Sequence, residues 1–206
     1  MKRCIIIGAG EGYLPEKMPE GFVIAADGGY NTAISAGIIP DVLIGDLDSI
    51  EGEIPADTEV IRHPVEKDET DLHLAYLEGV RRGYTDFLIL GCSGGRADHT
   101  FASYSLLLYA KNRAHSMTLF GRGGVVRVIK NETVTLKGAR QSHFSLFAFG
   151  KEAQGVSIEG AEYNASNITL TPEFPLACSN RFLDGEVKVS VTDGALLAVV
   201  EDENYF

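Results

Sequence analysis

The sequence predicts an α/β fold, with an N-terminal parallel-sheet α/β domain (residues 1–124) followed by a C-terminal antiparallel β-sandwich (residues 125–206). In the first part, short runs that are apolar throughout alternate with helical patterns, which is typical of a parallel sheet covered by helices on both faces. In the second part, short β-like runs follow one another between Gly-rich and Asn-rich turns, with no helical pattern between them. The change comes at Gly121-Arg122-Gly123-Gly124, so we expect the domain boundary near residues 121–130.

The elements of the first domain follow from apolar runs and from helical spacing. In the segment 71–82, Leu72, Tyr76 and Val80 recur at helical spacing, and Gly83 ends the pattern. The expected helices are 29–37, 71–82 and 98–113. The expected strands are 3–7, 22–26, 42–44, 59–62, 87–90 and 117–120.

The second domain shows strand patterns only. The expected strands are 125–129, 133–137, 143–149, 155–158, 167–171, 185–191 and 196–200. Short runs at this spacing, with turn residues between them, favour a small antiparallel sandwich or barrel.

Composition and charge limit the partners of the chain. A content of 45% hydrophobic and 23% charged residues over 206 residues is ordinary for a soluble globular protein with a real core. The formal net charge of −11 argues against nucleic acid and against acidic membrane surfaces, because both attract a basic footprint. Three widely spaced cysteines without a CxxC pair argue against structural zinc and a disulfide framework, and favour a reducing cytoplasm. No apolar run is long enough for a signal peptide or a membrane span.

Two aspartates follow the expected strand 42–44. Asp46 and Asp48 stand one residue apart in IGDLDSI, and on an extended chain both side chains would point the same way. They would lie at the carboxyl edge of the sheet, where open α/β folds bind ligands. Carboxylates this close repel each other unless a cation lies between them, and Mg²⁺ suits such oxygens and brings phosphates with it. A solvated turn is an equally good interpretation of these two acids alone.

The stretch KDETD (residues 67–71) precedes the expected helix 71–82. Asp68 or Thr70 could cap that helix, which is the commonest role of such residues. If Asp68 is the N-cap, Asp71 falls at the third helical position, and both acids gather at one helix start. Lys67 beside them could contact a phosphate oxygen. Taken alone, the stretch favours capping.

A glycine-rich loop follows the expected strand 87–90. It runs through Gly94, Gly95 and Arg96 to Asp98 and His99, where a helix is expected to begin. Glycines let the backbone approach a ligand, helix-start N–H groups favour anions, and arginine holds phosphate bidentately. The plainer interpretation is a tight turn, an N-cap and a surface histidine. Because glycine, arginine and helix start coincide at the expected ligand edge, we favour a phosphate site.

Asp27-Gly28-Gly29 repeats this arrangement after the expected strand 22–26. By itself it also fits a strand-end turn with a helix cap. In a parallel sheet, however, loops that leave three strands share one edge, so we expect the three polar loops to meet.

The glycines after the first expected strand suggest a dinucleotide-binding protein, but the sequence around them does not fit one. Gly8, Gly10 and Gly12 resemble a dinucleotide-binding fingerprint, but their spacing is GxGxG and not GxGxxG. Pro15 and Pro19 occupy the place of the crossover helix, and proline interrupts helix interiors. We therefore set the dinucleotide interpretation aside. No GxxxxGK[ST] motif occurs, which excludes a P-loop enzyme.

Together these motifs resemble those of the thiamine pyrophosphokinase family. The likeness rests on ADGGYN (26–31), PDVLIGDLDSI (40–50), EKDETD (66–71), GGRADH (94–99) and the later pair Ser179-Asn180. The resemblance implies a nucleotide-binding catalytic domain and a thiamine-binding β-sandwich, assembled as a homodimer with shared active sites. It implies Mg²⁺-dependent transfer of pyrophosphate from ATP to the thiamine hydroxyl, giving thiamine diphosphate and AMP. The chain departs from the family pattern at Arg181, where glutamate is common, and it has no tryptophan.

The resemblance also implies roles for single residues. Asp46, Asp48 and Asp71 would hold Mg²⁺ and, with Arg96, form the catalytic group. The nucleotide would be bound by Lys67, Asp68, Gly94, Gly95, Arg96, Asp98 and His99. Thiamine would meet Asp27, Asn31, Ser179 and Asn180, the last two from the partner subunit.

Two other functions fit parts of the sequence. A catalytically silent nucleotide- or vitamin-binding regulator would use the same cleft and would be stabilised by its ligands without forming AMP. A nicotinamide oxidoreductase would be protected by NAD and not by ATP with Mg²⁺. The clustered acids and the Gly-Gly-Arg loop favour the kinase.

Overall fold

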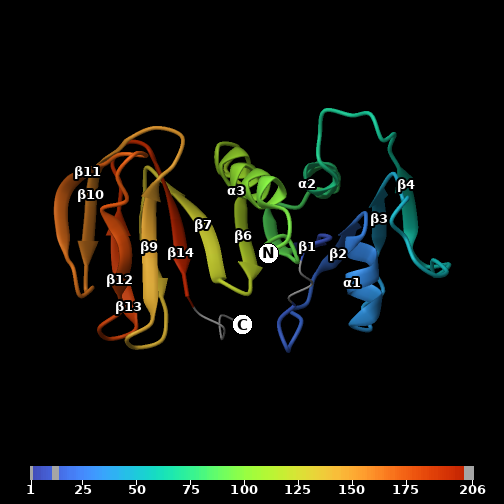
Figure 1. Cartoon of the computed structure of the whole chain (residues 1–206), viewed down its shortest axis with the longest axis horizontal. Helices are drawn as coiled ribbons and strands as arrows, with labels where there is room; N and C mark the ends of the chain where they lie inside the picture. Colours follow the sequence, from blue (N-terminus) through green and yellow to red (C-terminus); the bar gives the residue numbers. More distant parts are fainter. Residues whose placement is uncertain (1, 11–13, 202–206) are drawn as a thin grey trace. The chain divides into compact units, whose positions relative to one another are not determined.

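A computed structural model of the chain describes residues 2–10 and 14–201 (Figure 1). The chain divides into two compact units, of which the first ends at Arg122 and the second begins at Gly123. Within the described residues, no helix is long and apolar enough to cross a membrane.

The first unit is built on a parallel sheet. Its strands are β1 (Arg3–Ile7), β2 (Phe22–Ala26), β3 (Val42–Gly45), β4 (Glu59–Arg62), β5 (Asp86–Leu90) and β6 (Ser116–Gly121). They are paired in the order β6-β5-β1-β2-β3-β4, and each neighbouring pair in this order is parallel. Ile5, Ile24 and Ile89 have no exposed surface, as expected for strands covered on both faces. The prediction of a parallel α/β fold is confirmed.

The order of the strands changes direction beside β1. The chain first adds β2, β3 and β4 on one side of β1 (Figure 1). It then returns to place β5 on the other side of β1. Such a switch point leaves a crevice at the carboxyl ends of the strands, where open α/β sheets bind ligands.

Helices cover both faces of this sheet. They are α1 (Gly29–Ser35), α2 (Asp71–Arg81) and α3 (Ala97–Lys111). Tyr30 of α1 packs against Leu43, whereas Gly79 of α2 contacts Phe87. Side chains alternate between the two faces along a strand, and the register of the paired strands places Leu43 and Phe87 on opposite faces of the sheet. The helices α1 and α2 therefore cover opposite faces. Aromatic rings of α3 pack edge to face against those of α2, which places both helices on one face.

The second unit is a sandwich of antiparallel strands. One layer contains β7 (Gly124–Lys130), β9 (His143–Ala148), β12 (Ala177–Arg181) and β14 (Ala195–Val200), in the order β12-β9-β14-β7. The other contains β8 (Thr133–Lys137), β10 (Ala153–Glu159), β11 (Ala165–Leu170) and β13 (Glu186–Ser190), in the order β11-β10-β13-β8. Buried side chains from both layers form one core, in which the rings of Phe144 and Phe182 lie 4.9 Å apart. The sandwich was predicted, but strand β12 was not.

Candidate functional site

A cavity of about 450 Å³ opens at the carboxyl ends of β1, β2 and β5. The loops after these strands form one side, and the first turns of α2 and α3 form the other. The lining residues are Gly8, Ala9, Gly10, Ala26, Asp27, Thr70, Asp71, Leu72, Cys92, Gly94, Gly95, Arg96, His99, Ala102 and Ser103. The polar loops therefore meet at the edge where the sequence places them.

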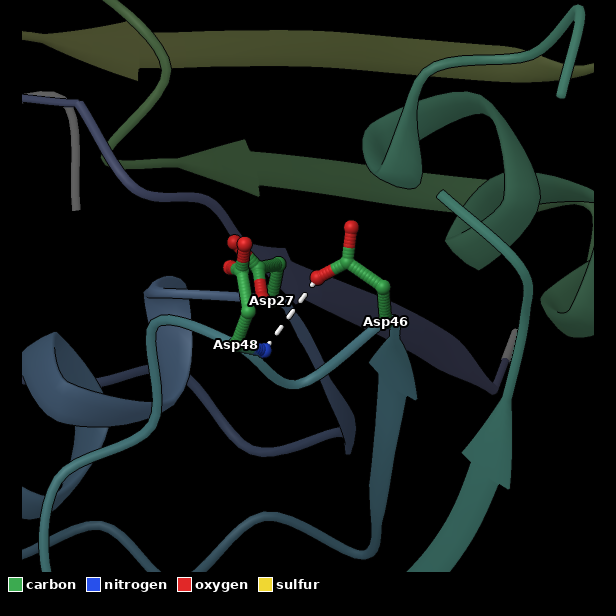
Figure 2. Close-up of side chains that lie close together, drawn as sticks. All are labelled: Asp27, Asp46 and Asp48. Atoms are coloured by element: carbon green, nitrogen blue, oxygen red, sulfur yellow. Dashed lines mark hydrogen bonds between the residues drawn. The ribbon is translucent and has the colours of Figure 1, made fainter. Parts of the chain in front are cut away.

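Three carboxylates gather beside this cavity (Figure 2). Asp27 follows β2, while Asp46 and Asp48 follow β3, and each offers an oxygen within 4.8 Å of the others. Asp48 donates its backbone N–H to Asp46 Oδ1 at 3.2 Å, and its own Oδ1 accepts from the Ser49 hydroxyl at 2.9 Å. Asp27 Oδ1 is buried and has no hydrogen-bond partner among the described residues.

These residues fit a divalent cation. A buried carboxylate oxygen without a partner is costly, and three carboxylates this close repel one another. Oxygen ligands of this kind are those that Mg²⁺ takes in proteins, usually together with substrate phosphates. The orphaned oxygen of Asp27 is thus explained if a cation sits among the three side chains.

The backbone brings the carboxylates together by a turn, not by an extended chain. Leu47, between the two aspartates, has a left-handed φ of 69°, and Asp27 has one of 45°. The expectation of an extended Asp46–Asp48 segment was therefore wrong. Gly45 permits the approach, because a Cβ there would lie 3.0 Å from the Cβ of Asp27. Any larger residue would push the two loops apart.

Asp71 faces the same cavity from the start of α2. Its carboxylate is not part of the group formed by Asp27, Asp46 and Asp48, whose oxygens lie within 4.8 Å of one another. Lys67 Nζ lies 2.9 Å from Asp71 Oδ1, and only 12% of the lysine side chain is exposed. Thr70 is the N-cap of α2, with its hydroxyl accepting from the His73 N–H at 3.2 Å. Of the two proposed caps, Thr70 is correct, and Asp68 lies exposed on the preceding loop.

The loop after β5 presents backbone and an arginine to the cavity. Gly94 and Gly95 have φ values of 82° and 65°, which glycine adopts without strain. Arg96 holds Asp98 with two hydrogen bonds, Nη2 to Oδ2 at 2.6 Å and Nε to Oδ1 at 3.1 Å. This contact lowers the pKa of Asp98 to about 2. Asp98 also accepts from the His99 N–H at 3.0 Å, and the N-cap position is held by Arg96, not by Asp98.

The charges around the cavity are unbalanced. Lys67 is paired with Asp71 and Arg96 with Asp98, so each of these cations is already neutralised by an aspartate. Within the described part of the chain, none of the three clustered carboxylates forms an ion pair with a lysine or arginine. This edge is therefore anionic, and it would repel a polyphosphate unless metal ions came with it.

The loop after β1 was missed as part of the site. Gly8 donates to Leu90 O at 2.9 Å and Gly10 donates to Gly91 O at 2.6 Å, so the loop lies directly against the one after β5. The GxGxG run was the available signal. Residues 14–21 form no helix, as Pro15 and Pro19 predict, while residues 11–13, Gly12 included, lie outside the described part.

Asn31, Ser179 and Asn180 lie outside the cavity. Asn31 stands on α1 and hydrogen-bonds the loop that carries Asp48. In the second unit, Ser179 is exposed with a left-handed φ of 57°. Asn180 is buried, and its side-chain amide exchanges two hydrogen bonds with the backbone of Tyr163, at 2.7 and 3.0 Å.

Comparison with known proteins gives a consistent result. A model described as "Thiamin pyrophosphokinase, catalytic domain" matches residues 18–119, and one described as "Thiamin pyrophosphokinase, vitamin B1 binding domain" matches residues 127–196. Thiamine pyrophosphokinase of Bacillus subtilis (strain 168) is 27% identical over 185 residues, which are 85% of this chain and 85% of that protein.

Solved structures share the fold. A thiamine pyrophosphokinase from Bacillus subtilis aligns with a TM-score of 0.86 and 23% identity, covering 98% of this chain and 99% of that one. A thiamin pyrophosphokinase from Candida albicans aligns with a TM-score of 0.79 and 15% identity, covering 98% of this chain and 89% of that one. At these identities the structures show a common fold, including both units of the chain.

Proposed function

The chain belongs to the thiamin pyrophosphokinase family, and from this premise we propose that it transfers pyrophosphate from ATP to the hydroxyl of thiamine. The products are thiamine diphosphate and AMP. In this reaction the hydroxyl oxygen bonds to the β-phosphorus, and the bond from that phosphorus to the oxygen bridging to the α-phosphorus breaks. AMP leaves with the bridging oxygen, and the hydroxyl proton passes to a base or to water.

The observation that carries the proposal is the anionic cluster beside the cavity. Transfers of phosphoryl groups depend mainly on positioning and on electrostatic stabilisation, with little covalent chemistry by the protein. A protein with a formal net charge of −11 that must bind a triphosphate needs local positive charge, and Lys67 and Arg96 are already paired with aspartates. Clustered carboxylates that hold a divalent cation resolve this conflict.

We assign the residues as follows. Asp46 and Asp48 would hold Mg²⁺, Asp27 would add its buried oxygen, and Asp71 faces the same cavity as Asp27 from α2. Mg²⁺, when bound, supplies positive charge to the phosphate oxygens.

The remaining polar groups position the nucleotide. The Gly94-Gly95 backbone and Arg96 contact the phosphates, while Asp98 holds the Arg96 guanidinium in one orientation. Lys67 and Asp68 lie just before the start of α2, and His99 of α3 lines the cavity.

The wider organisation follows the family. Residues 1–124 would bind the nucleotide and residues 125–206 would bind thiamine. The homodimer, with Ser179 and Asn180 near the vitamin of the partner's site, and the cytoplasmic location stay predictions. Since Ser179 is exposed and Asn180 is buried against Tyr163, Ser179 offers the contact and Asn180 shapes the strand that presents it. Sedimentation of the purified chain tests the dimer.

The activity has a direct test. Purified protein is mixed with ATP, Mg²⁺ and thiamine, and nucleotides and thiamine esters are separated by chromatography. AMP and thiamine diphosphate should appear in equal amounts. Release of ADP, or no product with any divalent metal, contradicts the proposal. Stabilisation by both ligands without AMP would instead identify a silent regulator.

A further inference from the structure

Asn31 uses both ends of its side-chain amide on the loop that carries the clustered acids. Its Nδ2 donates to Ser49 O at 2.8 Å, and its Oδ1 accepts from the Glu51 N–H at 3.0 Å. Both partners lie within three residues of Asp48 along the chain. Asn31 itself is not among the residues that line the cavity.

Tyr30, the preceding residue of α1, holds the same loop further along. Its ring is fully buried, and its hydroxyl donates to Glu53 O at 2.7 Å. Apolar side chains of the loop pack on the same small core as Tyr30, namely Leu47, Ile50 and Ile54. The helix α1 thus holds the loop both by the hydrogen bonds of Tyr30 and Asn31 and by the apolar contacts of Tyr30.

This fixation opposes a local tendency to open. Leu47 has a left-handed φ of 69°, which is unfavourable for a branched side chain. Asp48 stands within 4.8 Å of two other carboxylates, so charge repulsion also drives the turn away from Asp27. Without external support, the turn would relax to a shape in which the three oxygens separate.

We propose that Asn31 is a positioning residue that holds the carboxylates of Asp46 and Asp48 near Asp27 before a divalent cation binds. The inference rests on the proposed function for the purpose of the cation, but it concerns a step that can be measured without turnover. It differs from the expectation that Asn31 contacts thiamine, because both polar atoms of its side chain are already engaged.

The first test measures cation binding directly. Mn²⁺ binding to the protein without nucleotide is followed by the loss of the free Mn²⁺ signal in electron paramagnetic resonance. Asn31→Ala removes two hydrogen bonds, so we expect a dissociation constant about tenfold higher than in the wild type. Asn164→Ala is the matched control, because Asn164 also holds a loop N–H by its side chain, at 3.1 Å from Ala161 N, but lies in the second unit. It should leave Mn²⁺ binding unchanged.

The second test separates positioning from substrate contact. In steady-state assays, Asn31→Ala should raise the Mg²⁺ concentration for half-maximal rate about tenfold and leave the KM for thiamine unchanged. A raised thiamine KM with normal metal dependence overturns the proposal in favour of direct contact. Unchanged Mn²⁺ affinity, or a wild type that binds no Mn²⁺ without nucleotide, also overturns it.

A third variant keeps the test decisive if Asn31→Ala does not fold. Tyr30→Phe keeps the buried ring and removes only the hydrogen bond to Glu53 O, so a smaller rise in the Mn²⁺ dissociation constant, about threefold, is expected. An unchanged value in this variant counts against α1 as the support. If the wild type forms no AMP, the proposed function fails, but the Mn²⁺ comparison still decides the role of Asn31.

Discussion

Replacing Gly8 by alanine tests how closely the loops after β1 and β5 pack against each other beside the candidate pocket. A Cβ at Gly8 would lie 2.2 Å from Cys92 Sγ, whereas the next atoms, Gly91 O and Cys92 Cβ, would be 3.3 and 3.7 Å away. The φ of Gly8 is not in the left-handed region, so an alanine there meets no backbone strain. Most of the cost therefore comes from the Cys92 sulfur, which must move by more than about 1 Å to reach an ordinary contact distance, while Gly91 O needs only a small adjustment.

The magnitude follows from overpacking and can be cancelled by a second substitution. Crowding of this kind costs about 1–3 kcal/mol. In a chain of 206 residues, each kcal/mol lowers Tm by about 2–4 °C, so Gly8→Ala should lower Tm by about 2–12 °C. Cys92→Ala removes the sulfur and costs about 1 kcal/mol by itself. The double variant should unfold close to Cys92→Ala alone, because the added methyl group now has room.

Thermal unfolding followed by circular dichroism measures the four proteins of this cycle. Gly123→Ala is the control, because a Cβ there meets nothing within 4 Å and its φ is not in the left-handed region. It should leave Tm within about 1 °C of the wild type or raise it slightly. If the losses from Gly8→Ala and Cys92→Ala simply add, the sulfur is not the obstacle and the reasoning about this contact is refuted.

Three further predictions concern the charged groups of the site. Asp48→Asn should lower the rate of AMP formation at least about a hundredfold without lowering the Tm of the metal-free protein. Asp57→Asn, which changes an exposed acid elsewhere in the first unit, should leave both the rate and the Tm unchanged. Wild-type rates in Asp48→Asn would exclude its metal role. Asp27→Asn should raise the Tm of the metal-free protein by about 2–4 °C, because it relieves charge repulsion worth about 1 kcal/mol. The same variant should lose most of the stabilisation that Mg²⁺ gives the wild type. A lower Tm of the metal-free variant contradicts this reasoning. The Arg96 guanidinium lowers the pKa of Asp98 to about 2, so their pairing is complete above the ordinary carboxyl pKa and is lost as the pH falls through about 2. In an NMR titration, Arg96→Ala should return this pKa towards its ordinary value, and no change would show that another group sets it.

The fold was predictable where burial alone determines the residue pattern. Strands β1 and β5 are apolar and buried after their first residues, because helices or loops cover them on both faces, and both strands begin within one residue of the predicted positions. Strand β12 gave no such signal. Its sequence ACSNR exposes Cys178 and Ser179 at the edge of a layer, and its register with β9 is irregular between Ala177 and Asn180. Backbone hydrogen bonds define this strand, and no side-chain alternation accompanies them.

The site was predictable in outline and not in detail. Polar residues that follow parallel strands must share one edge, so the meeting of Asp27 with the acids after β3 could be expected from the sequence. The turn at Leu47 could not, because a branched residue with a left-handed φ contradicts its own local preference. The contribution of Gly8 depends on β5 returning beside β1, and that pairing joins residues about eighty positions apart. Local patterns carry no information about such a pairing.

Left-handed torsions and like charge occur together at this edge of the sheet, and a ligand would relieve only the charge repulsion. A bound cation offsets the repulsion among the three carboxylates, but it does not change the left-handed torsions of Asp27 and Leu47, which cost of order 1 kcal/mol or more each. Those torsions must be held by the protein itself, and the contacts of Tyr30 and Asn31 with the loop are placed to do so. The acidic turn therefore has its shape before any ligand arrives. It follows that loss of these contacts should be felt first as weaker cation binding, while the parallel sheet beneath stays folded.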